Sequence, residues 1–312
     1  MAATTSQPVG NPNVDKPLRD LRQEVTDSIV EMLERGVAPW QKPWERGRGS
    51  LEMPFNPTSE RAYRGGNALH LMATGLQRAY QDPRWMTYKQ AIEAGWQVRR
   101  GEKGTQIEYW DVKPASDKST SDRSRDGAAA DSAKPQLIHR VYTVFNAEQI
   151  DRIPLHPPKE HTPFEAVQAG EQILRNFGAS IAHDQADRAF YSRAEDSIHL
   201  PPKDAFKEAG GYYGTALHEL AHWSGHPSRL DRNTLTESYR FGDVNYAREE
   251  LRAELASVFL AAQRGIPHNP EQHAAYVGSW IAALKRDKNE IFRAAHDGSV
   301  RVNKNETHGA KV

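Results

Sequence analysis

The five residues HELAH, from His218 to His222, constrain the fold of this chain more than any other part of its sequence. Histidines four residues apart lie on one face of a helix, one turn from each other, so both imidazoles can reach the same metal ion. Small or apolar residues precede the motif and fill its gaps, as a half-buried helix requires. We therefore predict a helix over residues 211–225, with His218 and His222 as metal ligands.

The same five residues match the zincin arrangement, in which two histidines hold a metal and the glutamate between them takes a proton from the attacking water. Glu219 is therefore the predicted catalytic base. The pattern fixes only three positions, so the alternative interpretation is a chance match on a helix that contains histidines. A third ligand in a suitable place distinguishes the two interpretations.

A second amphipathic helix supplies that ligand. It is predicted over residues 246–264, and Gly265 ends it. Glu250 and Glu254 lie four residues apart on one face of this helix. In zincins that use a glutamate ligand, a glutamate on a following helix binds the metal, and an acidic residue four positions later orients the first histidine. We predict Glu250 as the ligand and Glu254 as the residue that orients His218.

Alternative ligands stay open at this point. Glu249 and Glu254 are further carboxylate candidates on the same helix. His226 is a rival from the loop after the motif, although histidine-type zincins place their third histidine where this chain has Ser228. The chain contains no cysteine, so disulfides and thiolate metal sites are excluded.

Three protein ligands leave one position open on a tetrahedral metal, which is typical of a catalytic site. The predicted chemistry is metal-assisted hydrolysis of a peptide bond. Two histidines and a glutamate favour zinc (Zn2+), although Mn2+ and Ni2+ also accept these ligands. Strand 197–200 is the expected edge to which a substrate peptide adds. Tyr212 or Tyr213 is a candidate for stabilising the oxyanion, and packing at the helix start is the alternative role.

Aromatic and basic side chains are interleaved in the first half of the chain. Residues 46–103 include ten basic and five acidic side chains. Aromatic rings that stack on bases, placed among cations that contact phosphates, are typical of proteins that bind single-stranded nucleic acid. The alternative is that the aromatics form the core and the basic loops are solvated. The candidate DNA-binding residues are Trp40, Lys42, Trp44, Arg61, Tyr63, Arg64, Trp85, Lys89, Arg99, Arg100 and Lys103.

Global composition adds three constraints. The 41 basic residues balance the 41 acidic residues, so only a local patch of charge could attract nucleic acid. The absence of cysteine fits a reducing compartment. No signal peptide and no apolar run of about 18 residues is present, so we expect a cytoplasmic protein without a membrane partner.

Two α+β halves are expected, each a small sheet with helices on it. We predict a disordered leader over residues 1–16, a first domain over 17–155 and a second over 156–312. Residues 113–135 lack aromatic and large aliphatic side chains, so we predict a disordered insert at the tip of a hairpin between strands 107–112 and 137–145. The other expected elements are helices at 18–36, 67–80, 87–95, 164–177, 270–285 and 288–296, and strands at 179–183 and 189–192.

With these residues in view, the chain resembles the ArdC family of plasmid antirestriction proteins. The resemblance covers nearly all of the chain except the leader and the insert. It rests on long segments that include APWQKPW, FNPTSERAYRGGNALHL, VRRGEKGTQIEYW, YYGTALHELAHWSGHPSRLDR and YAREELRAELAS.

The resemblance implies a mixed α/β N-terminal domain that binds single-stranded DNA with little sequence preference, and a C-terminal zincin-like metallopeptidase domain of the glutamate type. It also implies protection of incoming plasmid DNA from host restriction during conjugation. The enzymatic hypothesis is that the second domain cleaves an unknown host protein. The alternative hypothesis is a non-enzymatic DNA-binding protein whose metal site is structural.

Overall fold

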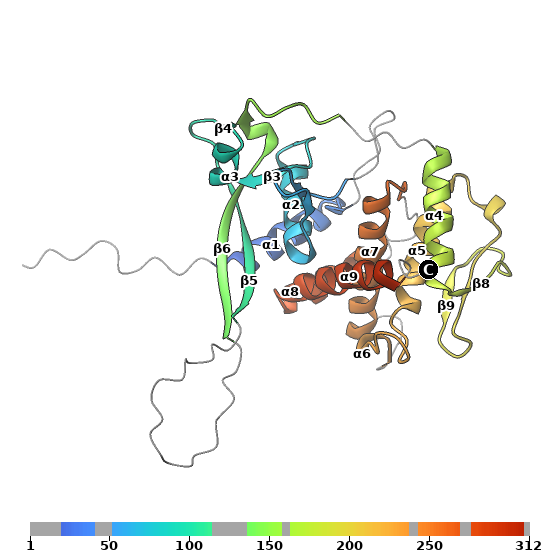
Figure 1. Cartoon of the computed structure of the whole chain (residues 1–312). Helices are drawn as coiled ribbons and strands as arrows, with labels where there is room; N and C mark the ends of the chain where they lie inside the picture. The colour runs from blue at the N-terminus through green and yellow to red at the C-terminus, as the bar shows by residue number, and fades with distance from the viewer. Residues whose placement is uncertain are drawn as a thin grey trace, which may run out of the picture.

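The computed structural model describes residues 20–40, 52–113, 136–157, 163–236, 243–268 and 276–308 (Figure 1). The predicted leader, the two DNA-binding candidates Lys42 and Trp44, and all of the predicted insert except Lys113 lie outside these residues. In the part of the chain that the structure describes, helices and short sheets are mixed, which confirms the predicted α+β class.

The first half forms a three-stranded antiparallel sheet of order β3-β6-β5, with helices beside it. The predicted hairpin is confirmed, and its paired strands reach Lys113 and Gln136. Gly36 and Gly95 follow helices in the left-handed conformation that ends them, with φ of 75° and 79°. The elements are α1 (Leu21–Glu34), β1 (Phe55–Asn56), β2 (Arg61–Ala62), α2 (Gly65–Gln77), β3 (Trp85–Thr87), α3 (Tyr88–Glu93), β4 (Gln97–Val98), β5 (Thr105–Lys113), β6 (Gln136–Asn146), η1 (Ala147–Gln149) and β7 (Ile150–Asp151).

The second half is mainly helical. Its elements are α4 (Pro163–Phe177), β8 (Ser180–Ala182), β9 (Phe190–Ser192), β10 (Ser197–His199), η2 (Lys203–Ala205), α5 (Ala209–Trp223), α6 (Asn233–Thr236), α7 (Val244–Arg264), α8 (Val277–Arg286) and α9 (Glu290–His308). The two predicted metal-site helices are α5 and α7. None of the helices in the described residues is both long and apolar enough to span a membrane.

The last helix, α9, continues well beyond its predicted end at residue 296. The predicted helix ends two residues before Gly298. In the structure a Cβ on Gly298 would lie 3.1 Å from the backbone nitrogen of Ala256 in α7. Gly298 therefore lies inside α9, where its lack of a side chain allows α9 and α7 to approach each other closely.

The predicted substrate-edge strand is wrong. β10 lies in the centre of a three-stranded sheet of order β8-β10-β9. It pairs in parallel with β8 and antiparallel with β9, so neighbouring strands occupy both of its edges. A substrate peptide cannot add to β10 by backbone pairing, and only β8 and β9 are edge strands of this sheet.

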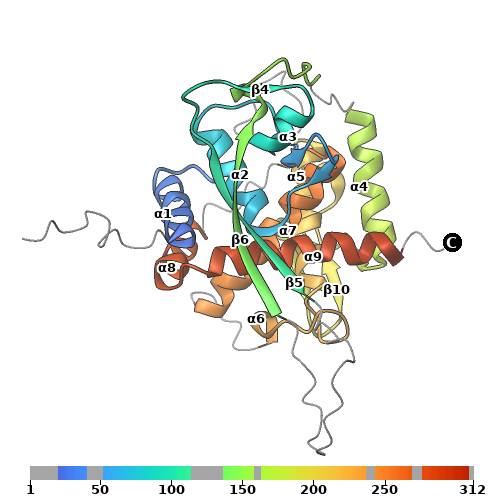
Figure 2. The same cartoon turned by 60° about the vertical axis from the view of Figure 1, so that its left-hand side comes forward.

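One hydrophobic core runs through both halves of the chain. Leu33 and Leu69 of the first half lie in the same buried cluster as Phe259 and Trp280 of the second. Helix α9 packs against both α2 and α7, and α1 packs against α8 (Figures 1 and 2). The predicted boundary near residue 155 stays a prediction, but the two halves share their largest core.

Candidate metal centre and nucleic-acid interface

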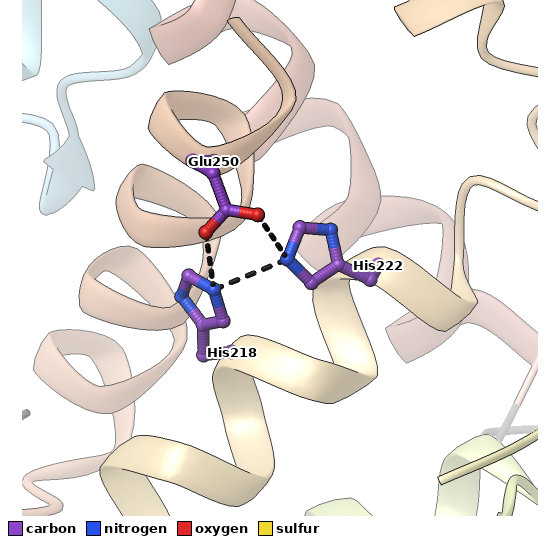
Figure 3. Close-up of side chains that lie close together, drawn as sticks. All are labelled: His218, His222 and Glu250. Atoms are coloured by element: carbon purple, nitrogen blue, oxygen red, sulfur yellow. Dashed lines mark hydrogen bonds and ion pairs between the residues drawn. The ribbon is translucent and has the colours of Figure 1, made fainter. Parts of the chain in front are cut away.

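Helices α5 and α7 position the predicted metal ligands. Both helices are buried through most of their length, because Leu217 and Leu220 of α5 and Leu251 and Leu255 of α7 belong to the shared core. The four-residue spacing of the two histidines puts both rings on the side of α5 that faces α7 (Figure 3). The predicted ligands therefore lie on two helices that pack together in the shared core.

His218, His222 and Glu250 converge on one point (Figure 3). The Nε2 atoms of the two histidines are 3.1 Å apart. Oxygens of Glu250 lie 3.4 Å from Nε2 of His218 and 3.5 Å from Nε2 of His222. Ligands about 2.1 Å from a tetrahedral metal are about 3.4 Å from each other, so the spacing of these atoms fits one ion. Among the described residues, this is the group of donors that could hold a metal.

Glu249 contacts the outer nitrogen of His222 and lies outside the group of converging donors. One of its oxygens lies 3.2 Å from Nδ1 of His222, on the side of the ring away from Glu250. Arg232 Nε and Thr234 Oγ1 donate to its other oxygen at 2.8 and 2.6 Å. Burial alone would raise the pKa of Glu249, but the Arg232 guanidinium and His222 outweigh burial and hold that pKa well below its usual range.

Glu254 faces His218 from behind, at the position where an orienting residue was predicted. Its Oε2 lies 3.9 Å from Nδ1 of His218, and its Oε1 accepts a hydrogen bond of 3.0 Å from the indole N–H of Trp40. Burial would lower the pKa of His218, but Glu250 and Glu254 raise it well above its ordinary value. The carboxylates around this histidine thus favour a cation at the site.

Glu219, the predicted base, sits in the same turn of α5 and is 8% exposed. Tyr246 and Tyr276 lie beside the site, with hydroxyl oxygens 3.1 Å apart. Burial and the negative charge of Glu250 raise the pKa of both tyrosines, and Glu219 contributes at Tyr276. Hydroxyl groups that stay protonated therefore lie close to the ligand and the predicted base.

The oxyanion role predicted for Tyr212 or Tyr213 finds no support, because the hydroxyls of both are paired elsewhere. That of Tyr212 lies 3.0 Å from Nε2 of His183, and that of Tyr213 donates to Glu171 at 2.8 Å. Both rings are buried in the core, which agrees with the alternative role of packing at the start of α5.

His226 lies apart from the converging donors. Its Nδ1 lies 2.8 Å from Oγ of Ser228, in the loop after α5. The group of converging donors in the described residues contains Glu250 instead. The predicted glutamate-type set agrees with this convergence, whereas His226 contacts Ser228 in the loop.

Trp40 and Trp85 are corrected from DNA-binding candidates to core residues. They are 1% and 2% exposed, so neither ring is available to stack on a base. Tyr63 is partly buried, and its hydroxyl donates to the backbone carbonyl of Trp85 at 3.0 Å. These three aromatic residues therefore agree with the alternative interpretation, in which large aromatic side chains form the core.

The six other basic candidates within the described residues are exposed. Three of them lie on the turn between β4 and β5, and Arg99 there is 2.7 Å from Glu102. Arg99 and Arg100, with the exposed ring of Tyr88, line a shallow pocket of about 690 Å3. The six residues are Arg61, Arg64, Lys89, Arg99, Arg100 and Lys103.

An exposed cluster on the β5–β6 hairpin was missed by the sequence-based list of candidates. Tyr109 and Tyr142 are 50% and 38% exposed, and their ring centroids are 5.9 Å apart. Arg140 pairs with Tyr109 across the strands and lies beside Tyr142, which raises the pKa of its guanidinium. The register of the hairpin places Tyr109, Arg140 and Tyr142 on one face of the sheet. The alternation of side chains along both strands could have predicted this shared face from the sequence.

The chain matches two family models. Residues 19–145 match the N-terminal domain of anti-restriction factor ArdC. Residues 168–297 match a zincin-like metallopeptidase. The second match includes both helices of the candidate metal centre.

Curated relatives extend over most of the chain. Two Escherichia coli proteins named DNA primase TraC are 52% and 48% identical over 91% and 90% of it. The chain spans only 26% and 19% of the length of these two relatives. The uncharacterized protein y4eC of Sinorhizobium fredii is 33% identical, and the match covers 88% of each chain.

Solved structures of the antirestriction protein ArdC from plasmid R388 have the same fold. The metal-free form has a TM-score of 0.72, with 37% identity over 94% of this chain and 98% of that one. The Mn(II)-bound form has a TM-score of 0.71, with 37% identity over 94% and 99%. The R388 protein therefore exists in a metal-bound form.

Proposed function

Because this chain belongs to the ArdC family of antirestriction proteins and contains a zincin-like metallopeptidase domain, we propose that it hydrolyses peptide bonds at a divalent-metal centre and binds single-stranded DNA. The observation that carries the hydrolytic part is the convergence of His218, His222 and Glu250 beside Glu219. Buried histidine and carboxylate donors at this spacing match a metal site that keeps a position open for substrate.

The metal we propose is zinc. Two imidazole nitrogens and one carboxylate oxygen are the donor set of catalytic zinc sites, and the Mn(II)-bound R388 relative supports a divalent ion more generally. When bound, such an ion polarises the substrate carbonyl and lowers the pKa of a coordinated water. Glu249 and Glu254 face the Nδ1 atoms of His222 and His218 and would favour the ring protons there, so that the Nε2 atoms would bind the ion.

Glu219 is the residue that we assign to proton transfer. It would accept a proton from water as the water oxygen bonds to the carbonyl carbon. It would then return that proton to the amide nitrogen as the carbon–nitrogen bond breaks, which yields a carboxylic acid and an amine. The partial burial of Glu219 shields this transfer from bulk water.

Removal of the metal tests the hydrolytic proposal. We expect the chelator-treated protein to stop cleaving an unfolded model polypeptide, because the proposed reaction needs the metal to activate water. Addition of one equivalent of Zn2+ or Mn2+ should restore the cleavage. Cleavage would be followed by mass spectrometry of the products. Cleavage that survives complete removal of the metal would contradict a metallopeptidase. Cleavage that never appears with either ion would leave DNA binding with a structural metal as the function.

Binding of single-stranded DNA is the second part of the proposal, and the exposed hairpin cluster of Tyr109, Arg140 and Tyr142 supports it. Flat aromatic faces beside a cation form a platform for successive bases, and phosphate contacts add an attraction that salt weakens. The exposed cations on the β4–β5 turn lie on the same half of the molecule. We propose that these cations also contact the phosphates of the strand.

Alanine at Tyr109 and Tyr142 together is expected to weaken binding of a labelled single strand, since loss of one stacked base costs about 1–3 kcal/mol. Fluorescence anisotropy at two salt concentrations would measure the change. Trp110→Ala is the matched control, because Trp110 is 47% exposed on the opposite face of the same strand. Equal losses in the control and the double variant would reject the assigned face.

In the cell, we propose that these activities act together on incoming plasmid DNA in the cytoplasm. The R388 relative is an antirestriction protein, and the E. coli relatives are named DNA primases, which supports a role on DNA. The peptidase substrate that we propose is a host protein of the restriction response.

A further inference from the structure

Trp40 is distant in sequence from the zincin-like half, but it reaches the metal centre in the structure. Its indole nitrogen donates to Oε1 of Glu254 at 3.0 Å, in a buried bond between residues 214 positions apart. The other oxygen of Glu254 faces Nδ1 of the ligand His218 at 3.9 Å. Two contacts therefore connect a residue of the first half to a metal ligand of the second.

The end of α1 directs Trp40 to this place. Gly36 adopts the left-handed conformation, with φ of 75°, and Val37 donates to the carbonyl of Met32 at 2.9 Å. This helix end reverses the chain and sends Trp40 into the shared core. There the ring centroid of Trp40 lies 6.1 Å from that of Trp280. Packing, as well as the hydrogen bond, thus determines where the indole N–H points.

The two orienting carboxylates are supported in different ways. Glu249 is held by Arg232 and Thr234, which both lie within the residues that match the zincin-like family. Glu254 is fully buried, and the indole that holds it comes from outside that match. A buried carboxylate requires donors, because an oxygen without one costs the free energy of its lost hydration.

We infer that Trp40 is a positioning residue of the metal centre. Its N–H holds Glu254 so that this carboxylate faces Nδ1 of His218, which favours the ring proton on Nδ1 and leaves Nε2 to face the metal. The inference rests on the proposed metal site. It means that the zincin-like half obtains part of its metal-binding machinery from the half that we propose binds DNA.

The test compares metal affinities of full-length variants. Trp40→Phe removes the indole N–H, and we expect about 10- to 100-fold weaker Mn2+ binding, the usual effect of removing a residue that supports a ligand. Electron paramagnetic resonance of free Mn2+ gives the dissociation constant. Trp85→Phe is the matched control, since Trp85 is equally buried but belongs to a different cluster, and its Mn2+ affinity should equal that of the wild type.

A double-mutant cycle separates positioning from general destabilisation. If Trp40 acts through Glu254, then Trp40→Phe should change the affinity little in a Glu254→Gln background. If Trp40→Phe does not fold, incorporation of 3-benzothienylalanine at position 40 keeps the ring size and removes only the N–H, and the same loss of affinity is expected.

Three results would overturn the inference. The first is wild-type affinity in both position-40 variants. The second is an equal loss with and without Glu254, which would indicate a structural role only. The third is a wild-type chain that binds no Mn2+. That result would overturn the proposed metal centre itself, and the first two would leave that centre intact.

Discussion

Replacing His218 by alanine is expected to reduce the metal content from about one ion per chain to none, because the two remaining protein donors are too few to hold a divalent ion. The loss should also abolish the stabilisation by added metal, which for the wild type is about 2.7 kcal/mol at a metal concentration one hundred times the dissociation constant. Elemental analysis of protein purified without a histidine tag, and thermal unfolding with and without Zn2+, measure the two effects.

His226→Ala is the matched control for this prediction. His226 lies four residues beyond His222 in the sequence, but its ring contacts Ser228 instead of the converging donors. This variant should keep a full equivalent of metal. Unchanged metal content in His218→Ala, or no metal in the wild type, would contradict the proposal that the HELAH segment binds a metal.

Replacing Glu219 by glutamine is expected to lower the rate of peptide hydrolysis by about 10²- to 10⁴-fold, the usual contribution of a general acid–base group. Metal content should not change, because Glu219 is not among the three converging donors. The glutamine keeps the size of the side chain and removes only its ability to accept the proton. Steady-state cleavage of a model polypeptide by metal-loaded protein measures the effect.

Glu208→Gln serves as the matched control, since Glu208 lies at the N-cap of the same helix and is exposed. It should cleave like the wild type. A Glu219→Gln variant with full activity would exclude the assigned base. Transfer of a plasmid into a restricting recipient then distinguishes the two biological hypotheses, because protection that survives Glu219→Gln would indicate a role for DNA binding without proteolysis.

The ligand set was accessible from the sequence because it depends on local helix geometry. Spacings of four residues placed His218 near His222, and an apolar stripe predicted that the helix carrying Glu250 packs on theirs. Glu249 could not be assigned in this way. Neighbouring residues on a helix point about 100° apart, so the spacing alone does not show that Glu249 and Glu250 both face the histidines. The position of the Glu249 carboxylate also depends on Arg232, which donates to it from a separate loop.

The errors share one physical cause, which is pairing between distant segments. The composition of the strand at residues 197–200 suits an edge strand and a central strand equally. Its pairing with β8 and β9 makes it the central strand. Tyr212 has a hydroxyl that could serve a metal site, but His183 binds it. Trp40 has a ring suited to bases, but the turn at Gly36 directs it into the core.

Short-range periodicity and motifs in the sequence predicted most of the helices, the hairpin, the favoured set of donors and the family resemblance. The contacts between each carboxylate and its histidine, and the hydrogen bond from an indole of the first half to a carboxylate beside His218, are visible only in the folded chain. These contacts join residues up to 214 positions apart. Their formation depends on how the shared core packs, which no local pattern encodes.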